Sequence, residues 1–199
     1  MDESRDADVR DVRAGVLKMA TYYINADTGN DSTGNGTSGS PWQTLSKALT
    51  ASVSGDTIYL QNATATYAFA YALNLSNRTV TGQSVGGCVI DGGGNARTWS
   101  VGGVVIFNTV KFSNIRSNAS ENIFHNPGTL TFNNCIFSRI DLDGYLEVGG
   151  IVGALSSYTV NFNFCLFDRI RRYSPGTYAL GSITAGRTYT VTVDGCVFY

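Results

Sequence analysis

Several residue types and patterns are scarce in this sequence. Its 199 residues include 3 prolines and one histidine, His125, and only 15% of them are charged. The formal net charge of −1 leaves no basic footprint for nucleic acid. No apolar run approaches the roughly 18–20 residues that a membrane-spanning helix needs. We therefore expect neither a nucleic-acid partner nor insertion into a membrane.

The N-terminal segment lacks the apolar core of a secretory signal peptide. Residues 1–19 read MDESRDADVRDVRAGVLKM, a charged stretch without a hydrophobic face. We interpret them as a tether before a single domain, residues 20–199, in which residues 20–56 form a cap and residues 57–199 form the coils. Export is then encoded elsewhere, or the chain rides on a particle such as a virion, or it is a fragment.

Turn-forming residues are abundant, with 23 glycines and many Asn, Ser and Thr, which is typical of short strands joined by tight turns. Ser40-Pro41-Trp42-Gln43 has the composition of a helix start, with a capping Ser, a Pro at the first position and a Gln at the third. Trp42, Leu45 and Leu49, with Ala48 beside them, follow at helical spacing. This predicts a short helix that covers the first coil.

An internal repeat from Cys88 onward is the strongest pattern in the sequence. The segments CVIDG, VKFSNI, CIFSRI, CLFDRI and CVFY align at spacings of 22, 25, 30 and 31 residues. Alternate positions then form columns of similar residues, namely a cysteine column (Cys88, Val110, Cys135, Cys165, Cys196) and two aromatic columns (Ile90, Phe112, Phe137, Phe167, Phe198; and Phe107, Phe132, Phe162, Val193).

Two alternating strands therefore flank a fixed break in each repeat. The break carries Asn or Asp, and we expect these residues to adopt the left-handed turn conformation: Asn108, Asn133, Asn163 and Asp194. Repeats of this length without a helical stretch can pair only in parallel, each with the same column one coil away. The sequence predicts an all-β right-handed parallel β-helix of about six coils, stacked about 4.8 Å apart, with an N-terminal capping helix. The last strand stops at Tyr199, so we expect a truncated C-terminal end.

Two stretches resemble known families. Residues 21–60, with YYINADTGNDSTG, SPWQTLSKAL and GDTIYL, resemble the cap and first coil of the pectate lyase-like superfamily. Residues 86–167, with VIDGGGNARTWSV, NPGTLTFNNCIFSRI and GGIVG, resemble the repeats of adhesin-like and polymorphic outer-membrane β-helix proteins. These resemblances imply the fold and leave the activity open, because such proteins include lyases, hydrolases, tailspikes and adhesins. VIDGGG is also similar to the start of polygalacturonases, whose paired catalytic Asp and His-bearing motif are absent from this sequence.

The cysteines have three interpretations: a buried ladder of thiols, a disulfide and a metal site. Their shared inward column with Val110 favours a structural ladder formed by Cys88, Cys135, Cys165 and Cys196. The spacing lacks the C-x₂₋₄-C pairs of zinc sites, so no metal is expected.

Charged residues gather after the second strand of the repeat. Arg139 and Arg169 fall in one column and should lie one coil apart, where two cations repel unless carboxylates or an anionic ligand compensate. Lyases of the resembled superfamily use an Arg or Lys base beside acidic calcium ligands on an outer groove, and the alternative is a solvated ion-pair network. The catalytic candidates, if the protein is an enzyme, are Arg139, Arg169, Asp141, Asp143, Asp168 and Arg171.

Two further ligand sites can be considered. Tyrosines in the longer connections could stack on sugar rings or serve ordinary packing, and the binding candidates are Tyr145, Tyr158, Tyr173 and Arg172. The Asp27–Asn35 loop offers oxygen ligands for calcium, although it fits no EF-hand spacing and such loops are commonly only turns.

These patterns support three functional hypotheses. The first is a non-catalytic module of a surface, adhesive or phage-tail protein that binds a polysaccharide or cell-surface glycan. The second is a polysaccharide lyase or glycoside hydrolase on the same scaffold, and the third is a structural spacer. The adhesin-like repeats and the missing catalytic motifs favour the first, with an extracellular, cell-surface or virion location.

One column of the repeat should point outward between the cysteine and phenylalanine columns. This outward column is apolar in four of five coils and reads Val89, Lys111, Ile136, Leu166, Val197. An exposed apolar stripe tends to mark an interface, and an open strand edge invites pairing. We expect either a longer solenoid or a homo-oligomer, with a trimer as the preferred closed form. The alternative is that a loop or the tether covers the stripe.

Overall fold

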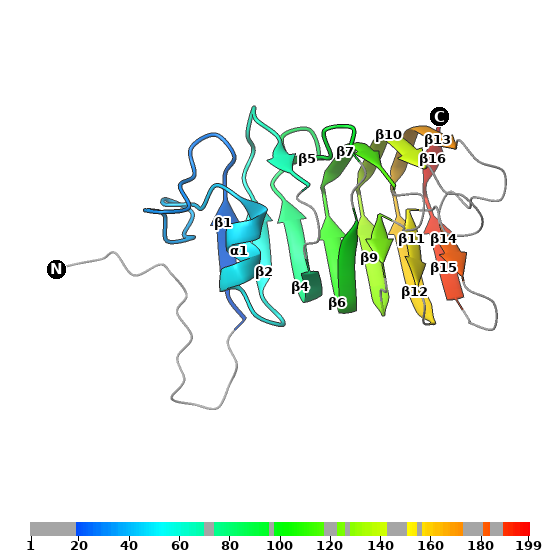
Figure 1. Ribbon diagram of the computed structural model, residues 1–199, viewed down its shortest axis with the longest axis horizontal. Helices are drawn as coiled ribbons and strands as arrows, with labels where there is room; N and C mark the ends of the chain where they lie inside the picture. Colours follow the sequence, from blue (N-terminus) through cyan, green and yellow to red (C-terminus); the bar gives the residue numbers. More distant parts are fainter. Residues whose placement is uncertain are drawn as a thin grey trace.

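The computed structural model describes residues 19–69, 74–95, 98–117, 123–125, 128–142, 151–154, 157–172, 181–183 and 189–199. The fold is an all-β parallel solenoid with a short α-helix at its N-terminal end (Figure 1). Every pairing between its named strands is parallel, each strand bonding to the equivalent strand of the next turn. Within the described part of the chain, no helix has the length and apolarity to cross a membrane.

Two parallel sheets build the solenoid. The larger sheet is ordered β1-β2-β4-β6-β8-β11-β14, with β9, β12 and β15 paired beside this path. Its strands are β1 (Thr21–Ile24), β2 (Thr57–Leu60), β4 (Asn74–Gly82), β6 (Trp99–Asn108), β8 (Phe124–His125), β9 (Thr129–Asn133), β11 (Val152–Ala154), β12 (Tyr158–Asn163), β14 (Gly181–Ile183) and β15 (Tyr189–Asp194).

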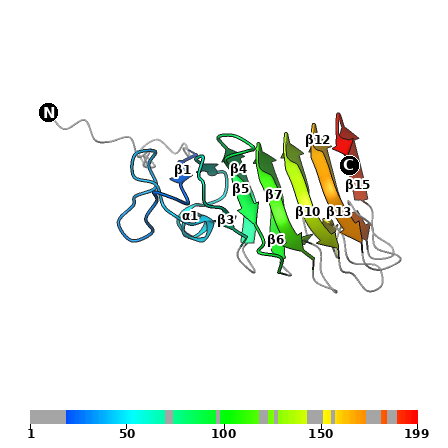
Figure 2. The same ribbon diagram turned by 90° about the horizontal axis from the view of Figure 1, so that it is seen from above.

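The second sheet stacks six short strands in the order β16-β13-β10-β7-β5-β3. They are β3 (Tyr67–Ala68), β5 (Val89–Asp91), β7 (Lys111–Arg116), β10 (Ile136–Leu142), β13 (Leu166–Arg172) and β16 (Val197–Phe198). Figure 2 shows β5, β7, β10 and β13 side by side along the long axis. This sheet carries Arg139, Arg169 and the charged residues around them.

The regular part of the solenoid is shorter than the sequence predicted. A three-strand turn is complete in β8–β10, β11–β13 and β14–β16, which gives about three turns rather than six. The start of β6 pairs with β8 and its end pairs with β9. The one strand β6 therefore precedes two separate strands in the next turn. The part of the solenoid from β1 to β7 does not show three separate strands in each turn and is less regular.

The predicted inward columns form the core. Phe107, Phe132 and Phe162 stack with ring centroids 5.4 and 5.2 Å apart. A second stack joins Phe112 to Phe137 at 5.2 Å and Phe137 to Phe167 at 5.1 Å. All six rings are at most 1% exposed. Since replacing a buried Phe with Ala typically costs 3–5 kcal/mol, these stacks are a major source of stability.

The helix α1 (Leu45–Ala51) begins later than predicted. Its N-cap is Thr44, whose hydroxyl accepts a hydrogen bond from the Lys47 backbone N–H, so the capping box proposed for Ser40 and Gln43 is wrong. Trp42 remains extended because it forms a parallel bridge with Ile24 and stacks on Tyr22 at 5.2 Å. Leu45, Ala48 and Leu49 are buried as predicted, and α1 lies over β1 and β2 (Figure 1).

The left-handed residue of each break follows the Asn or Asp instead of being that residue. Positive φ angles occur at Thr109 (59°), Asn134 (51°), Phe164 (54°) and Gly195 (58°). The preceding asparagines end their strands and use their side chains to bond across turns: Asn163 Nδ2 donates to Asn133 Oδ1, and Asn133 Nδ2 to Asn108 Oδ1, both at 2.8 Å. The side-chain amide, rather than backbone freedom, therefore explains the asparagine column.

Candidate functional site

A second column of left-handed residues lies within the strands of the six-stranded sheet. Asn114, Arg139 and Arg169 have φ angles of 54°, 55° and 55°. Pairing skips each of them and resumes in unchanged register at the isoleucine that follows, so they stack as one column of unpaired positions. Asn tolerates this conformation, whereas other residues with a Cβ pay roughly 1–2 kcal/mol. Arg139 and Arg169 therefore occupy positions whose backbone conformation suits asparagine better than arginine.

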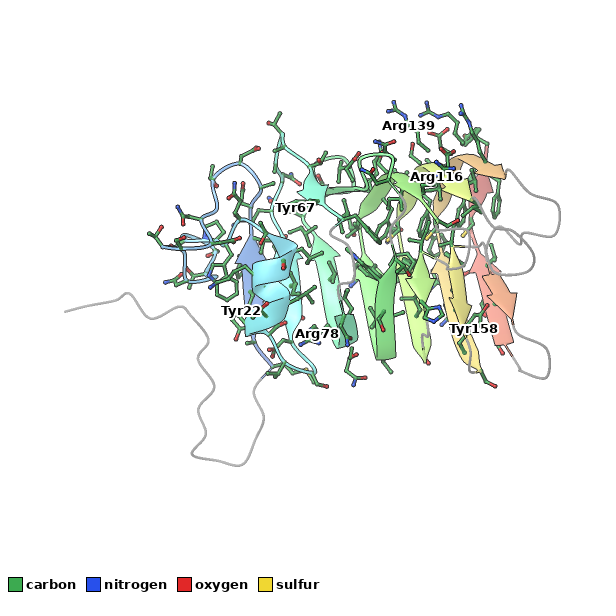
Figure 3. The ribbon with its side chains drawn as sticks, viewed as in Figure 1. Tyr22, Tyr67, Arg78, Arg116, Arg139 and Tyr158 are labelled. Carbon is green, nitrogen blue, oxygen red and sulfur yellow. The ribbon has the colours of Figure 1, made fainter. Side chains whose placement is uncertain are left out.

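A ladder of alternating charge lies two residues further along the same strands. Arg116 pairs in register with Asp141, and Asp141 pairs with Arg171 on the other side. Partners in neighbouring strands are about 4.8 Å apart, so each arginine is within range of the carboxylate between them. In Figure 3, Arg116 and Arg139 lie at the outer edge of the molecule, on β7 and β10.

Asp168 and Arg169 form an ion pair at this left-handed column. The Arg169 guanidinium donates to Asp168 Oδ2 at 2.7 Å, and the Ser138 hydroxyl donates to the same oxygen at 2.9 Å. The hydrogen bond from Arg169, aided by that from Ser138, lowers the pKa of Asp168. The same bond raises the pKa of Arg169. Within the described part of the chain, Arg139 makes no hydrogen bond or ion pair and is exposed.

The described side chains of β7, β10 and β13 give this face a positive charge. We define the arginine face by five cations and two carboxylates: Lys111, Arg116, Arg139, Arg169, Arg171, Asp141 and Asp168. The whole chain carries −1, so the cations are concentrated locally. Two like charges about 5 Å apart repel by somewhat under 1 kcal/mol in water, and an anionic ligand would relieve that repulsion.

The two carboxylates of the arginine face lie on neighbouring strands but out of register with each other. Asp141 lies three residues beyond Ser138, the strand partner of Asp168, so the backbones of the two aspartates are offset by about 10 Å along the strand direction. Paired glycosidase carboxylates are roughly 5–9.5 Å apart. A catalytic base needs a lowered pKa, and the ion pair with Asp168 raises the pKa of Arg169. Asp143, the remaining catalytic candidate, lies outside the described residues.

Of the tyrosine candidates, the structure describes Tyr158. Tyr158 is only 4% exposed, so its ring cannot stack on a sugar from solvent, and that prediction is wrong. Tyr158 is the first residue of β12, whose burial alternates along the strand, and its side chain is on the buried side (Figure 3). Tyr145 and Tyr173 lie outside the described residues, and for Arg172 only the backbone position in β13 is described.

The cysteines occupy one inward column in register with Val110. Backbone hydrogen bonds fix this register: Lys111 N donates to Cys88 O, Ile136 N to Val110 O, Leu166 N to Cys135 O and Val197 N to Cys165 O. All four thiols are free, and Cys88, Cys135 and Cys165 are buried. Cys196 is only half-buried, contrary to prediction, because it lies in the last described turn.

The Asp27–Asn35 loop uses its carboxylates to hold itself in place. Asp27 accepts hydrogen bonds from the backbone N–H groups of Thr64 and Ala65, at 2.6 and 2.8 Å. Asp31 accepts from Gln43 N, Thr44 N and the Thr44 hydroxyl. These bonds favour the turn interpretation over calcium. Among the residues with described placement, no group of three potential metal ligands occurs.

Phe164 is an exposed residue that the sequence reasoning missed. It is 63% exposed and occupies the left-handed column that otherwise carries Thr109, Asn134 and Gly195. The signal was present, because FNFCLF has Phe where FNNCIF has Asn and VDGCVF has Gly. The position of Phe164 was overlooked because the left-handed conformation was assigned to the preceding residue, Asn163.

Comparisons with known proteins support the fold. No protein family and no curated protein matches the sequence. Among solved structures, the chain is similar to the native GH136 lacto-N-biosidase from Eubacterium ramulus, with a TM-score of 0.51 and 13% identity. The similarity covers 75% of this chain and 34% of that chain, so this chain spans about a third of that protein's length. At this identity, the likeness shows a shared β-helix architecture alone.

Proposed function

We propose that this protein is a non-catalytic glycan-binding β-helix module that recognises acidic sugars through the arginine face. The observation that carries the proposal is the pair Arg139 and Arg169, which lie one turn apart in left-handed positions. Both have left-handed backbone angles, where Asn114 shows a less strained alternative. Strained residues that persist on a surface are often retained for function. Guanidinium groups bind carboxylate and sulfate oxygens through paired, charge-assisted hydrogen bonds.

The class of ligand has support from structural similarity. The GH136 protein is a lacto-N-biosidase, so a related scaffold acts on a glycan. The separation of Asp141 and Asp168 and the raised pKa of Arg169 favour binding over hydrolysis or elimination. A flat stack of parallel strands presents its side chains at a regular spacing, which suits a repeating polymer. Such a module fits a surface, adhesive or phage-tail protein acting outside the cell.

The test compares binding and stability in the same variants. We expect the protein to bind polygalacturonate or chondroitin sulfate in a salt-sensitive manner and to ignore neutral dextran. Arg139→Asn should weaken this binding about tenfold, because one charge-assisted contact is lost. The same change should raise the melting temperature by a few degrees, because about 1 kcal/mol of backbone strain is removed.

Lys47→Gln provides the matched control. Lys47 is an exposed cation on α1, and its substitution removes the same charge far from the arginine face. It should leave the affinity unchanged. Equal affinity in the parent and the Arg139→Asn variant would refute the proposal. Release of unsaturated uronate or new reducing ends from the polysaccharides would instead support an enzyme on the same scaffold.

A further inference from the structure

Phe164 has an unusual combination of backbone conformation and exposure. Its φ angle of 54° is left-handed, which is rare for a bulky side chain, and the residue is 63% exposed. The equivalent residue one turn earlier is Asn134, and one turn later it is Gly195, both of which suit this conformation. Phe164 thus combines strain with the exposure of an apolar ring, and neither contributes to stability.

The next turn supports the ring of Phe164. A Cβ atom placed on Gly195 would lie 2.4 Å from Phe164 Cδ1 and 2.6 Å from Cε1, so the ring rests against the backbone of Gly195. A residue with a side chain at that position would displace the ring. The turn that follows Phe164 is already in place, with Phe164 N donating to Asp194 O at 2.7 Å. The ring is therefore exposed with the turns on both sides of it, those of Asn134 and Gly195, in place.

The surroundings of the ring differ from the arginine face. Asn134, one turn away in the same column, is exposed, and its side chain offers an amide donor and acceptor. The outward residues of the adjoining strands are also neutral and polar, with Thr131, Asn161 and Thr192 in register. Arg169 follows Phe164 by five residues, in the second half of β13. The corner therefore combines an aromatic surface with neutral hydrogen-bonding groups and one exposed carboxylate, Asp194, which would repel an acidic sugar.

We propose that Phe164 and Asn134 form a stacking subsite for the apolar face of an uncharged pyranose ring. The C–H face of a sugar packs on an aromatic ring, and its hydroxyl groups bond to amides and hydroxyls at the edge. The inference goes beyond the arginine face, because it requires no charge on the ligand. It rests on the proposed function only for the class of ligand, a glycan.

The experiment titrates the full chain with neutral hexose and N-acetylhexosamine oligosaccharides, followed by NMR shifts and calorimetry. We expect the parent and Phe164→Tyr to bind at least one of them, with little effect of salt. Phe164→Asn should bind about tenfold more weakly, because it removes the ring. It should also melt a few degrees higher, since Asn suits the left-handed position. Val104→Asn replaces another exposed apolar residue, 50% exposed on β6, and should change nothing.

Several outcomes would overturn the subsite. It is wrong if no oligosaccharide of the panel binds the parent, or if Phe164→Asn binds as the parent does. It is also wrong if light scattering shows that the parent self-associates and Phe164→Asn does not, because the ring is then a protein contact. Failure of the proposal for the arginine face would be seen separately, because that site is tested by the binding of acidic polymers, by the effect of salt on it and by Arg139→Asn.

Discussion

Asn163 pairs in register with Asp194, and this pair ends the asparagine ladder of the solenoid. Each amide in the ladder points its Nδ2 toward the preceding turn, so Oδ1 of Asn163 faces the following turn. An ionised Asp can only accept hydrogen bonds and cannot donate to that oxygen. The ladder of side-chain hydrogen bonds therefore ends at Asn163 in β12 and does not continue to Asp194 in β15.

Asp194→Asn should extend the ladder by one hydrogen bond. We expect the free energy of unfolding to rise by about 0.5–1 kcal/mol, as for an ordinary side-chain bond near the surface. Denaturant melts measure the change. The control repeats the substitution in an Asn163→Ala background, where the acceptor is missing and the gain should vanish. A gain of equal size in both backgrounds would show that the ladder is not its cause.

Asp168 should titrate below its ordinary pKa of about 3.8, because it accepts hydrogen bonds from Arg169 and Ser138. A carboxyl whose pKa is depressed by folding stabilises the protein above the unfolded pKa. This stabilisation is lost as the pH falls through the lower, folded value. Carbon-detected NMR titration gives the pKa directly. Arg169→Gln should return it toward 3.8, whereas Arg171→Gln should leave it unchanged. An ordinary pKa in the parent would contradict the ion pair.

The thiols should differ in reactivity according to their turn. Burial raises the pKa of Cys88 and Cys135, and a hydrogen bond from Cys135 lowers that of Cys165 without exposing its thiol. Cys196 is half-buried, so it should be the first residue that a maleimide labels in the native protein. Mass spectrometry locates the label, and all four thiols should react after unfolding. Rapid native labelling of Cys135 would refute the buried column.

The outward apolar column should mediate self-association. Val89, Lys111, Ile136, Leu166 and Val197 are paired in register and none is fully buried, so they form a continuous stripe. Light scattering over rising concentration should show association, with a trimer as the proposed form. Leu166→Lys should shift the equilibrium toward the monomer by placing a charge in the interface. A parent that stays monomeric at high concentration, like the variant, would exclude this interface.

The columns could be predicted from sequence because they depend on a period of two residues and on a repeated spacing. Once Cys135 aligned with Cys165, the positions of Phe137 and Phe167 followed without further information. The register of Arg139 and Arg169 followed for the same reason, and the structure places both in one column. Patterns that recur in every turn are over-determined, since an error in one turn would conflict with its neighbours.

Features that occur once were harder to predict. Trp42 has helical spacing to Leu45, yet its bridge to Ile24 keeps it extended, and such a tertiary contact has no local signature. The sequence does not show whether Tyr158 lies before the strand or within it. The structure extends β12 to include Tyr158, and the alternation of the strand then places its side chain in the core. The asparagine column was located correctly and explained wrongly, because turn and ladder use the same residue. Distinguishing them requires the hydrogen bond from Asn163 to Asn133.

The unequal spacing of the repeat also bears on how such a molecule changes in evolution. Successive cysteine-column positions are 22, 25, 30 and 31 residues apart, although the paired strands keep their register. Inserted residues are therefore absorbed between the strands, where they shift no side chain from inside to outside. A gene duplication whose two ends fall on the same column, such as Asn108 and Asn133, would add a whole turn and disturb only its two neighbours. The reach of the molecule can then lengthen in steps of one turn, while each existing surface keeps its residues.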